Sequence, residues 1–138
     1  MKTLVTYYSY SGKSRKLAEA FAESDCADIT EIKDLYRPNV LGAYTKGCYN
    51  AIKGFSWEIW PLKLDWSAYD RVVLYSPVWA GNPPPAVNAF LGFLPSGKSV
   101  VIHMVSASGK CKCQSRIEAA VKMKGSTPIK FDVIKNSQ

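Results

Sequence analysis

The sequence predicts an α/β protein with a five-stranded, doubly wound parallel sheet in the order 2-1-3-4-5. Segments with strand and helix character alternate along the whole chain, as in folds built from βαβ units. The stretches that begin at Leu4, Val72 and Val100 are almost continuously apolar and suit central strands, whereas those near Asp28 and Ile129 mix polar and apolar residues and suit edges. The length of 138 residues favours a single domain, residues 1–138.

The elements follow in a regular order. We expect strands over residues 3–8, 28–33, 71–76, 99–105 and 129–134. The first helix covers residues 13–24, with Leu17, Ala18 and Phe21 facing inward, and the last covers residues 114–123. Prolines open a helix after the third strand, and its apolar residues recur at i, i+3, i+4 and i+7. A further helix is expected from apolar residues at helical spacing, although glycines interrupt it: Leu41, Tyr44, Cys48, Ile52 and Phe55.

The chain after the fifth predicted strand holds only the four polar residues 135–138, too few for a helix. A C-terminal helix is therefore expected to be absent. One sheet face would then expose a few hundred Å² of apolar strand surface, and a symmetric homodimer is the simplest way to bury it. Coverage of that face by residues 57–60 is the alternative. We expect this segment to pack over the sheet edge as structure rather than to form a wall of a binding site.

Two loops carry the functional signal. The first, residues 9–14, reads Ser-Tyr-Ser-Gly-Lys-Ser between the first strand and the first helix, where hydroxyls and helix N–H groups can hold a phosphate or simply cap the helix. It lacks the Walker pattern. The second, residues 76–85, follows the third strand and contains Trp79, Gly81 and four prolines. Prolines make such a loop stiff, so it presents Trp79 at the carboxyl end of a strand, where open α/β sheets bind ligands.

The S-x-S-G-x-S loop and the P-V-W-x-G-x-P-P-P segment together resemble the flavodoxin family over nearly the whole chain. The resemblance implies an FMN-binding electron-transfer protein. It assigns the phosphate to the first loop and the flavin ring to the loops after the third and fourth strands, and Lys13 departs from the neutral residue common in the family. The expected cofactor-binding residues are Ser9, Tyr10, Ser11, Gly12, Lys13, Ser14, Pro77, Val78, Trp79, Ala80, Gly81, Ser106, Ser108 and Gly109. No catalytic residue and no metal ligand is expected.

Two alternatives stay open beside the electron carrier. One is a small FMN-dependent reductase of quinones or similar acceptors, although no dinucleotide-binding pattern is found. The other is a binding module of the same fold that has lost FMN. For the carrier, a carbonyl near Gly81 can accept a hydrogen bond from N5 of the reduced flavin. The loop around Trp79 contains no acidic residue, so the potential should be less negative than in acidic flavodoxins.

The net charge of +7 is unusual for the flavodoxin family and suggests an acidic redox partner or an anionic second substrate. No nucleic-acid motif and no apolar run of membrane-spanning length occurs in the sequence. The cytoplasm is the expected compartment, since the sequence begins directly with a strand and we see no signal peptide.

The four cysteines do not form a zinc pattern, and His103 is the only histidine, expected in the core. Cys26 and Cys48 are expected to be buried thiols. Lys110 and Lys112 are next to Cys111 and Cys113 in the sequence and can lower the pKa values of the two thiols. A disulfide across one residue is strained, so ordinary loop thiols are preferred over a redox pair.

Overall fold

Five parallel strands form one sheet within residues 2–36 and 39–135, the part of the chain described by the computed structural model. The observed order, β2-β1-β3-β4-β5, is the predicted one. The strands are β1 (Lys2–Tyr7), β2 (Asp28–Glu31), β3 (Tyr69–Pro77), β4 (Ser99–Ser106) and β5 (Thr127–Lys135). The helices are α1 (Lys13–Asp25), α2 (Val40–Gly42), α3 (Cys48–Lys53), α4 (Pro85–Gly92) and α5 (Gln114–Met123), with a π-helical turn at Ala43–Gly47 and a 3-10 turn at Trp66–Ala68.

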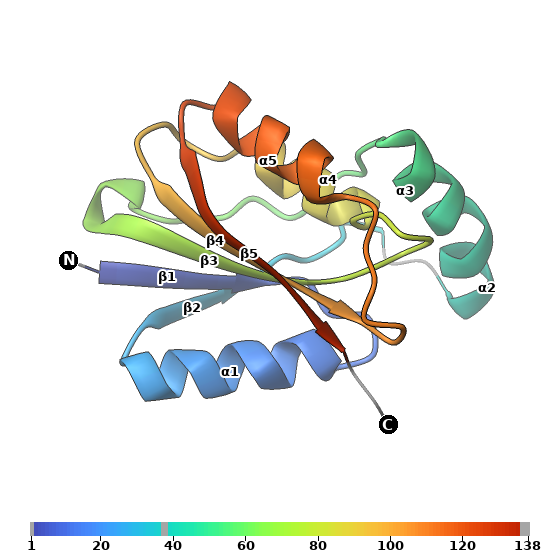
Figure 1. Cartoon of the computed structure of the whole chain (residues 1–138), viewed down its shortest axis with the longest axis horizontal. Helices are drawn as coiled ribbons and strands as arrows, with labels where there is room; N and C mark the ends of the chain where they lie inside the picture. The colour runs from blue at the N-terminus through green and yellow to red at the C-terminus, as the bar shows by residue number, and fades with distance from the viewer. Residues whose placement is uncertain (1, 37–38, 136–138) are drawn as a thin grey trace.

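Helices cover both faces of the sheet. Figure 1 shows α1 on one side and α4 and α5 on the other, with α2 and α3 beyond the carboxyl ends of the strands. On the α1 side, Ala18 packs against Val5 and Val73 of the central strands. On the other side, Phe90 and Ile117 belong to a larger core, and both are fully buried. Burial of each such large side chain contributes about 1.5–3 kcal/mol, so the two faces together fix α1, α4 and α5 on the sheet.

The exposed apolar surface expected on one face of the sheet is not found at the described residues of β4 and β5 on the α1 side. On the α1 side, Val101 and Val105 of β4 are each exposed by less than a tenth. Neighbouring β5 contributes Lys130 and Asp132 to this face, in register with β4, and their side chains are 59% and 45% exposed. The outer part of this face is therefore polar at Lys130 and Asp132, and Ile134 beyond them is partly buried.

The segment between β2 and β3 corrects a sequence prediction. Its helix is interrupted by a π-helical turn, and the residues that it buries are small: Ala43, Gly47 and Ala51. The larger residues expected to face inward are exposed, 72% for Leu41, 51% for Ile52 and 53% for Phe55, while the side chain of Tyr44 lies outside the described part. Small residues at every fourth position let the backbone of this segment pack closely against the rest of the protein. The buried face of the segment is therefore not its most hydrophobic face.

Residues 57–60 pack where the preferred interpretation placed them, beside the end of β2. Ile59 forms an isolated antiparallel bridge with Asp34, and Trp60 N donates a hydrogen bond to Lys33 O (2.9 Å). Trp57 nevertheless reaches Trp79, with ring centroids 6.3 Å apart. The segment is thus both an edge cover and a neighbour of the loop after β3.

The predictions of burial for Cys26, Cys48 and His103 are met to different degrees. The prediction of a buried Cys26 is wrong: this residue ends α1 with a positive φ of 51° and is exposed. Cys48 is only partly buried, although burial still raises the pKa of its thiol. His103 lies in the core as predicted, stacked on Tyr75 with ring centroids 4.7 Å apart.

Within the described residues, no helix combines the length and apolarity required to cross a lipid bilayer.

Candidate functional site

The loops after β1, β3 and β4 meet at the carboxyl edge of the sheet and enclose a cavity of about 260 Å³. The cavity is lined by Ser9, Tyr10, Ser11, Lys13, Ser14, Pro77, Val78, Trp79, Val105 and Ala107. Eight of these ten are residues that the sequence placed in the candidate site. The fold therefore brings the two signal-bearing loops together, as the strand order 2-1-3-4-5 requires of elements that follow adjacent strands β1 and β3.

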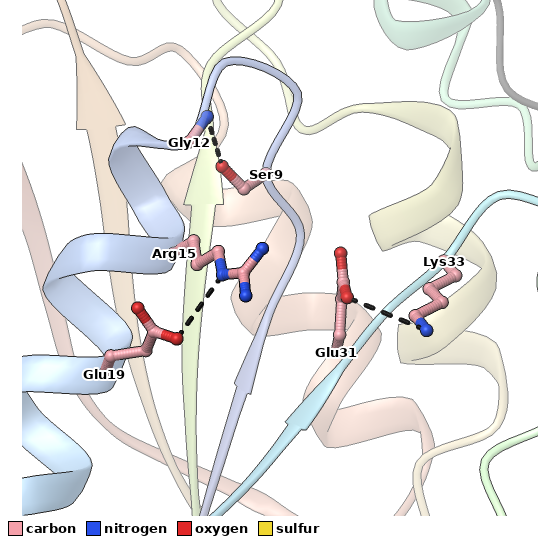
Figure 2. Close-up of polar contacts among 6 residues, drawn as sticks. All are labelled: Ser9, Gly12, Arg15, Glu19, Glu31 and Lys33. Carbon is pink, nitrogen blue, oxygen red and sulfur yellow. Dashed lines mark hydrogen bonds and ion pairs between the residues drawn. The ribbon is translucent and has the colours of Figure 1, made fainter.

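The β1–α1 loop is closed by a hydrogen bond in which Gly12 N donates to Ser9 Oγ (2.8 Å), as Figure 2 shows. Gly12 has a φ of 96°, a conformation that side chains with a Cβ rarely adopt. It is the N-cap of α1, where the structure has no side-chain capping hydrogen bond. The first-turn N–H groups of α1 consequently lie at the cavity without a capping carboxylate or hydroxyl, and they can bind an anion.

The charges around this loop favour an anion. The first turn of α1 contains Lys13, Arg15 and Lys16 and no acidic residue. Arg15 is engaged by Glu19 one turn later (3.4 Å), as Figure 2 shows, whereas Lys13 lines the cavity itself. The positive end of the α1 dipole adds to these charges.

Trp79 is held by a two-residue hairpin turn. Trp79 N donates to Asn82 O (2.7 Å), Asn82 N donates to Trp79 O (3.0 Å), and both intervening residues have positive φ, 51° for Ala80 and 81° for Gly81. This is the geometry of a type I′ turn, which favours glycine. Pro83 and Pro84 follow directly and are buried. The turn is therefore fixed at its base, and the indole projects from a rigid support.

The ring of Trp79 is half-buried among other aromatic rings. It makes edge-on contacts with Tyr8, Tyr10 and Trp57, with centroids 5.9–6.3 Å apart. On a further side it abuts Gly47, where an added Cβ would lie only 2.7 Å from Cζ3 of the indole. Sequence reasoning did not assign Gly47 to the site, because a glycine in a helical segment gives no sign of the ring that it accommodates.

Residues 106–109, expected to form the second wall of the ring site, contribute Ala107 to the cavity lining, next to Val105 of β4. Val105 and Ala107 line the cavity, while Ser106, Ser108 and Gly109 do not. The two serines bond to each other and to their own loop, with Ser106 Oγ donating to Lys110 O (2.9 Å). Alternation along the strand and into the loop explains the outcome, since Val105 and Ala107 share one side and the serines point elsewhere.

Three other expected cofactor-binding residues, Gly12, Ala80 and Gly81, also lie outside the cavity lining. The carbonyl of Gly81 accepts a hydrogen bond from Lys112 N (2.8 Å). The carbonyl of Ala80 accepts one from Asn82 Nδ2 (3.1 Å). The expected bond from a flavin to a carbonyl near Gly81 would therefore have to replace or share an existing internal bond if it is made to either of these two carbonyls.

Cys111 and Cys113 are joined in a disulfide, so the preference for ordinary loop thiols is wrong. Their Cα atoms are 5.5 Å apart, within the usual range for protein disulfides. The bend of the loop before α5 brings the two close in spite of the single intervening residue. Sequence spacing alone does not reveal such a bend.

The comparison with solved structures identifies the fold, whereas no family model and no curated protein sequence matches the chain. Among solved structures, a flavoprotein from Lactobacillus acidophilus NCFM in complex with FMN superposes with a TM-score of 0.77 at 23% identity, covering 96% of this chain and 92% of that one. A candidate flavoprotein from Bacteroides eggerthii DSM 20697 gives a TM-score of 0.81 at 18% identity, covering 99% and 90%.

Oxidised flavodoxin 2 from Bacillus cereus gives a TM-score of 0.61 at 16% identity, with 99% of this chain and 86% of that chain covered. These likenesses extend over nearly the full length of both partners. The chain therefore has the flavodoxin-like fold, an α/β architecture with a five-stranded parallel sheet in the order 2-1-3-4-5.

Proposed function

We propose that this protein binds FMN in the cavity between the β1–α1 loop and the Trp79 turn, and that it transfers electrons. The observation that carries the proposal is the convergence of an uncapped, basic helix N-terminus and a rigid tryptophan turn on one cavity. A flavoprotein of the same fold has been solved in complex with FMN, which supports the choice of ligand.

The residues at the N-terminus of α1 fit a phosphate group. The hydroxyls of Ser9, Ser11 and Ser14 and the first-turn N–H groups supply donors, and Lys13 supplies charge. Ser9 Oγ already accepts from Gly12 N, so its own proton is left to donate outward. One phosphate cradle is consistent with a mononucleotide rather than a dinucleotide.

The Trp79 turn fits a flat aromatic ring. The isoalloxazine supplies the redox chemistry when it is bound, and the protein orients it and limits its contact with water. Pro77, Val78 and Trp79 on one side and Val105 and Ala107 on the other give the cavity two mainly apolar walls. Neither wall contains a carboxylate, so no negative side-chain charge within the lining opposes reduction of the ring.

A titration with FMN and with riboflavin, followed by flavin fluorescence, tests the proposal. The wild-type protein should bind FMN more tightly, because riboflavin lacks the phosphate. Ser11→Leu should weaken FMN about tenfold or more, equivalent to about 1.4 kcal/mol, and leave riboflavin nearly unchanged. Ser24→Leu, the same exchange at the other end of α1, is the control. Equal losses for both ligands in Ser11→Leu would contradict the phosphate assignment.

Trp79→Ala should weaken FMN and riboflavin alike, by about 1–3 kcal/mol, the scale of aromatic stacking contacts. A chain that binds neither flavin at high micromolar concentration would instead favour a binding module that has lost FMN.

A reductase is the second candidate, and one observation favours it. A separate cavity of about 430 Å³ is lined by Tyr36, Gly42, Lys46, Ser56, Trp57 and Glu58. Trp57, which lines this cavity, also contacts Trp79. An electron acceptor bound in the cavity would therefore be separated from the proposed flavin site by these two rings. Oxidation of a nicotinamide cofactor by the FMN-loaded protein with a quinone acceptor would identify a reductase, and its absence would favour a carrier.

We further propose that the redox partner is acidic and that the protein acts in the cytoplasm. The support for the partner is the net charge of +7. Electron transfer to an acidic partner should slow steeply with rising salt, because the encounter is steered by opposite charges. A homodimer also remains a proposal, and sedimentation at micromolar concentration decides it. Subcellular fractionation tests the compartment.

A further inference from the structure

The loop between β4 and α5 holds a disulfide close to the proposed flavin site. Cys111 and Cys113 are bonded, whereas Cys26 and Cys48 are free thiols. Lys112, between the two bonded cysteines, donates its N–H to the carbonyl of Gly81 in the Trp79 turn. Cys111 Sγ itself lies 3.6 Å from that carbonyl oxygen. The disulfide is therefore in direct contact with the turn that carries Trp79.

The two sulfurs differ in access. Cys113 is fully buried in the core beneath α4 and α5, with no exposed surface. Cys111 is only partly buried and packs at the margin of the same core. An incoming thiolate can approach the sulfur of Cys111 and not that of Cys113, which makes Cys111 the attacked atom and Cys113 the leaving group.

Both sulfurs have groups that stabilise negative charge. Cys113 is the N-cap residue of α5, a ten-residue helix with no acidic residue in its first turn and no side-chain capping bond in the structure. A thiolate at this position faces the positive end of the helix dipole. Cys111 Sγ accepts a hydrogen bond from Cys113 N (3.2 Å). Lys110 and Lys112 are exposed on either side of Cys111 and add positive charge.

We propose that Cys111 and Cys113 form a redox-active dithiol–disulfide pair that exchanges two electrons with an external dithiol and whose state is transmitted to the Trp79 turn. The proposal does not depend on flavin binding. It assigns the pair a chemistry of its own, beside the electron-transfer site.

The reaction proceeds in two exchanges. One thiolate of the external dithiol attacks Cys111 Sγ, a new S–S bond forms, and the Cys111–Cys113 bond breaks with Cys113 leaving as the thiolate. The second thiol of the reductant then loses its proton and attacks its own partner sulfur in the mixed disulfide, which releases Cys111 as the thiolate. The external dithiol is oxidised to a disulfide, the protein pair gains two electrons, and the two protons pass to the cysteine thiolates or to solvent.

The coupling to the Trp79 turn follows from the contacts between Lys112, in the loop before α5, and Gly81, in the turn. With residues 111–113 in their present bend, Lys112 N donates a hydrogen bond to the carbonyl of Gly81 (2.8 Å). The side chain of Lys112 also packs against Gly81, since an added Cβ on Gly81 would lie 3.4 Å from its Cγ and Cδ. Breaking the S–S bond releases the constraint on this bend, so the environment of Ala80 and Gly81 should change.

The first test is a redox titration in mixtures of reduced and oxidised dithiothreitol, quenched with a maleimide mass tag. It uses the Cys26→Ser, Cys48→Ser protein so that only the pair reports. The two cysteines should gain two tags together as one two-electron couple. A pair that carries two tags at every ratio, or none even in excess reductant in the folded protein, would overturn the proposal.

The second test separates the roles of the two sulfurs. In this background, Cys113→Ser leaves Cys111 as the thiol, and Cys111→Ser leaves Cys113. Cys111 should react with a disulfide reagent at least about tenfold faster than Cys113, because Cys111 is partly exposed whereas Cys113 is fully buried. Circular dichroism confirms that both variants are folded. Equal rates in two folded variants would contradict the assignment of Cys111 as the attacked sulfur.

Amide NMR shifts in the oxidised and reduced states test the coupling. The shifts of Ala80, Gly81 and Lys112 should move between the states, while Gly97, in a turn with equally positive φ near the other end of β4, should not. Unchanged shifts at Gly81 would refute the coupling. FMN affinity of the two states is a separate measurement, so a failure to bind FMN would refute the proposed function without touching the thiol chemistry.

Discussion

Gly47 is the residue whose replacement tests the aromatic packing around Trp79 most directly. It lies in the π-helical turn before α3 with φ −62° and ψ −49°, a backbone conformation that alanine adopts readily. Helix propensity alone predicts that Gly47→Ala stabilises the protein by about 0.8–1 kcal/mol. The packing predicts the opposite. An added Cβ would lie 2.7 Å from Cζ3 and 3.1 Å from Cε3 of Trp79, and 3.4 Å from Cη2 of Trp57.

Carbon atoms in good contact are about 3.5–4.0 Å apart, so the indole would have to move by about 0.8 Å or more. Tyr8, Tyr10 and Trp57 already contact the indole edge-on, so it can move only by disturbing these contacts or by shifting into the cavity that it lines. Inserting a methyl group into such a site costs about 1–3 kcal/mol, which exceeds the gain in propensity. We expect Gly47→Ala to lower the free energy of unfolding by about 1 kcal/mol after both contributions.

Gly92→Ala is the matched control. Gly92 ends α4, and an added Cβ there would meet nothing within 4 Å. Urea unfolding followed by circular dichroism should place Gly92→Ala at or above wild type and Gly47→Ala below it, with a difference of about 1–3 kcal/mol. In a Trp79→Phe background, where the outer indole ring is missing, the cost of Gly47→Ala should largely vanish. If Gly47→Ala is as stable as Gly92→Ala, the packing argument fails.

Two further predictions concern buried polar groups. Tyr8→Phe removes the hydrogen bond from Tyr8 Oη to buried Asp34 (2.6 Å) and should lower the free energy of unfolding in urea by about 1.5–3 kcal/mol. Tyr69→Phe removes the hydrogen bond to exposed Asp28 (2.7 Å) and should lower it by less. Equal losses in the two variants would contradict a role for burial. Burial lowers the pKa of His103 despite the carboxylate of Asp132 nearby (3.6 Å), so the fold favours the neutral imidazole. Its contribution to stability is fully present above the unfolded pKa of about 6.5 and is lost as the pH falls below that value and through the lowered folded pKa. The unfolding free energy should therefore drop as the pH falls below about 6.5 in the wild type and drop less in His103→Gln, which lacks any histidine. The same drop in both proteins would refute the assignment.

The sequence was sufficient for the sheet and for the loops that follow its central strands. Near-continuous apolar runs identify β1, β3 and β4 because those strands are buried on both faces. The limits predicted for α5 agree with the observed Gln114–Met123, since its apolar period and the loop before it are both unambiguous. The stiffness of the Trp79 loop could be predicted because prolines restrict the backbone locally, independently of contacts with the rest of the chain.

The failures have a common physical origin in contacts between distant segments. The spacing of apolar residues locates an apolar stripe on a helix, but it does not show that Leu41 and Ile52 face solvent. Nor does it show that Gly47 is the residue that packs against the ring of Trp79. In the same way, the exposure of Cys26 follows from its place at the C-cap of α1. The disulfide between Cys111 and Cys113 depends on a bend that the Lys112–Gly81 hydrogen bond helps to hold.

Trp79 stands where these unpredictable contacts meet the predictable loop. The turn that carries it is restricted by the prolines that follow, which are evident from the sequence. The position of its ring is set by contacts with Gly47 and Trp57, which belong to the connection between β2 and β3. The carbonyl beside it is held by Lys112 from the loop after β4. A proline-stiffened loop therefore supplies a platform, while two segments remote in sequence decide how the ring on that platform lies. Substitutions in those segments should tune ligand affinity without touching any residue of the β1–α1 loop.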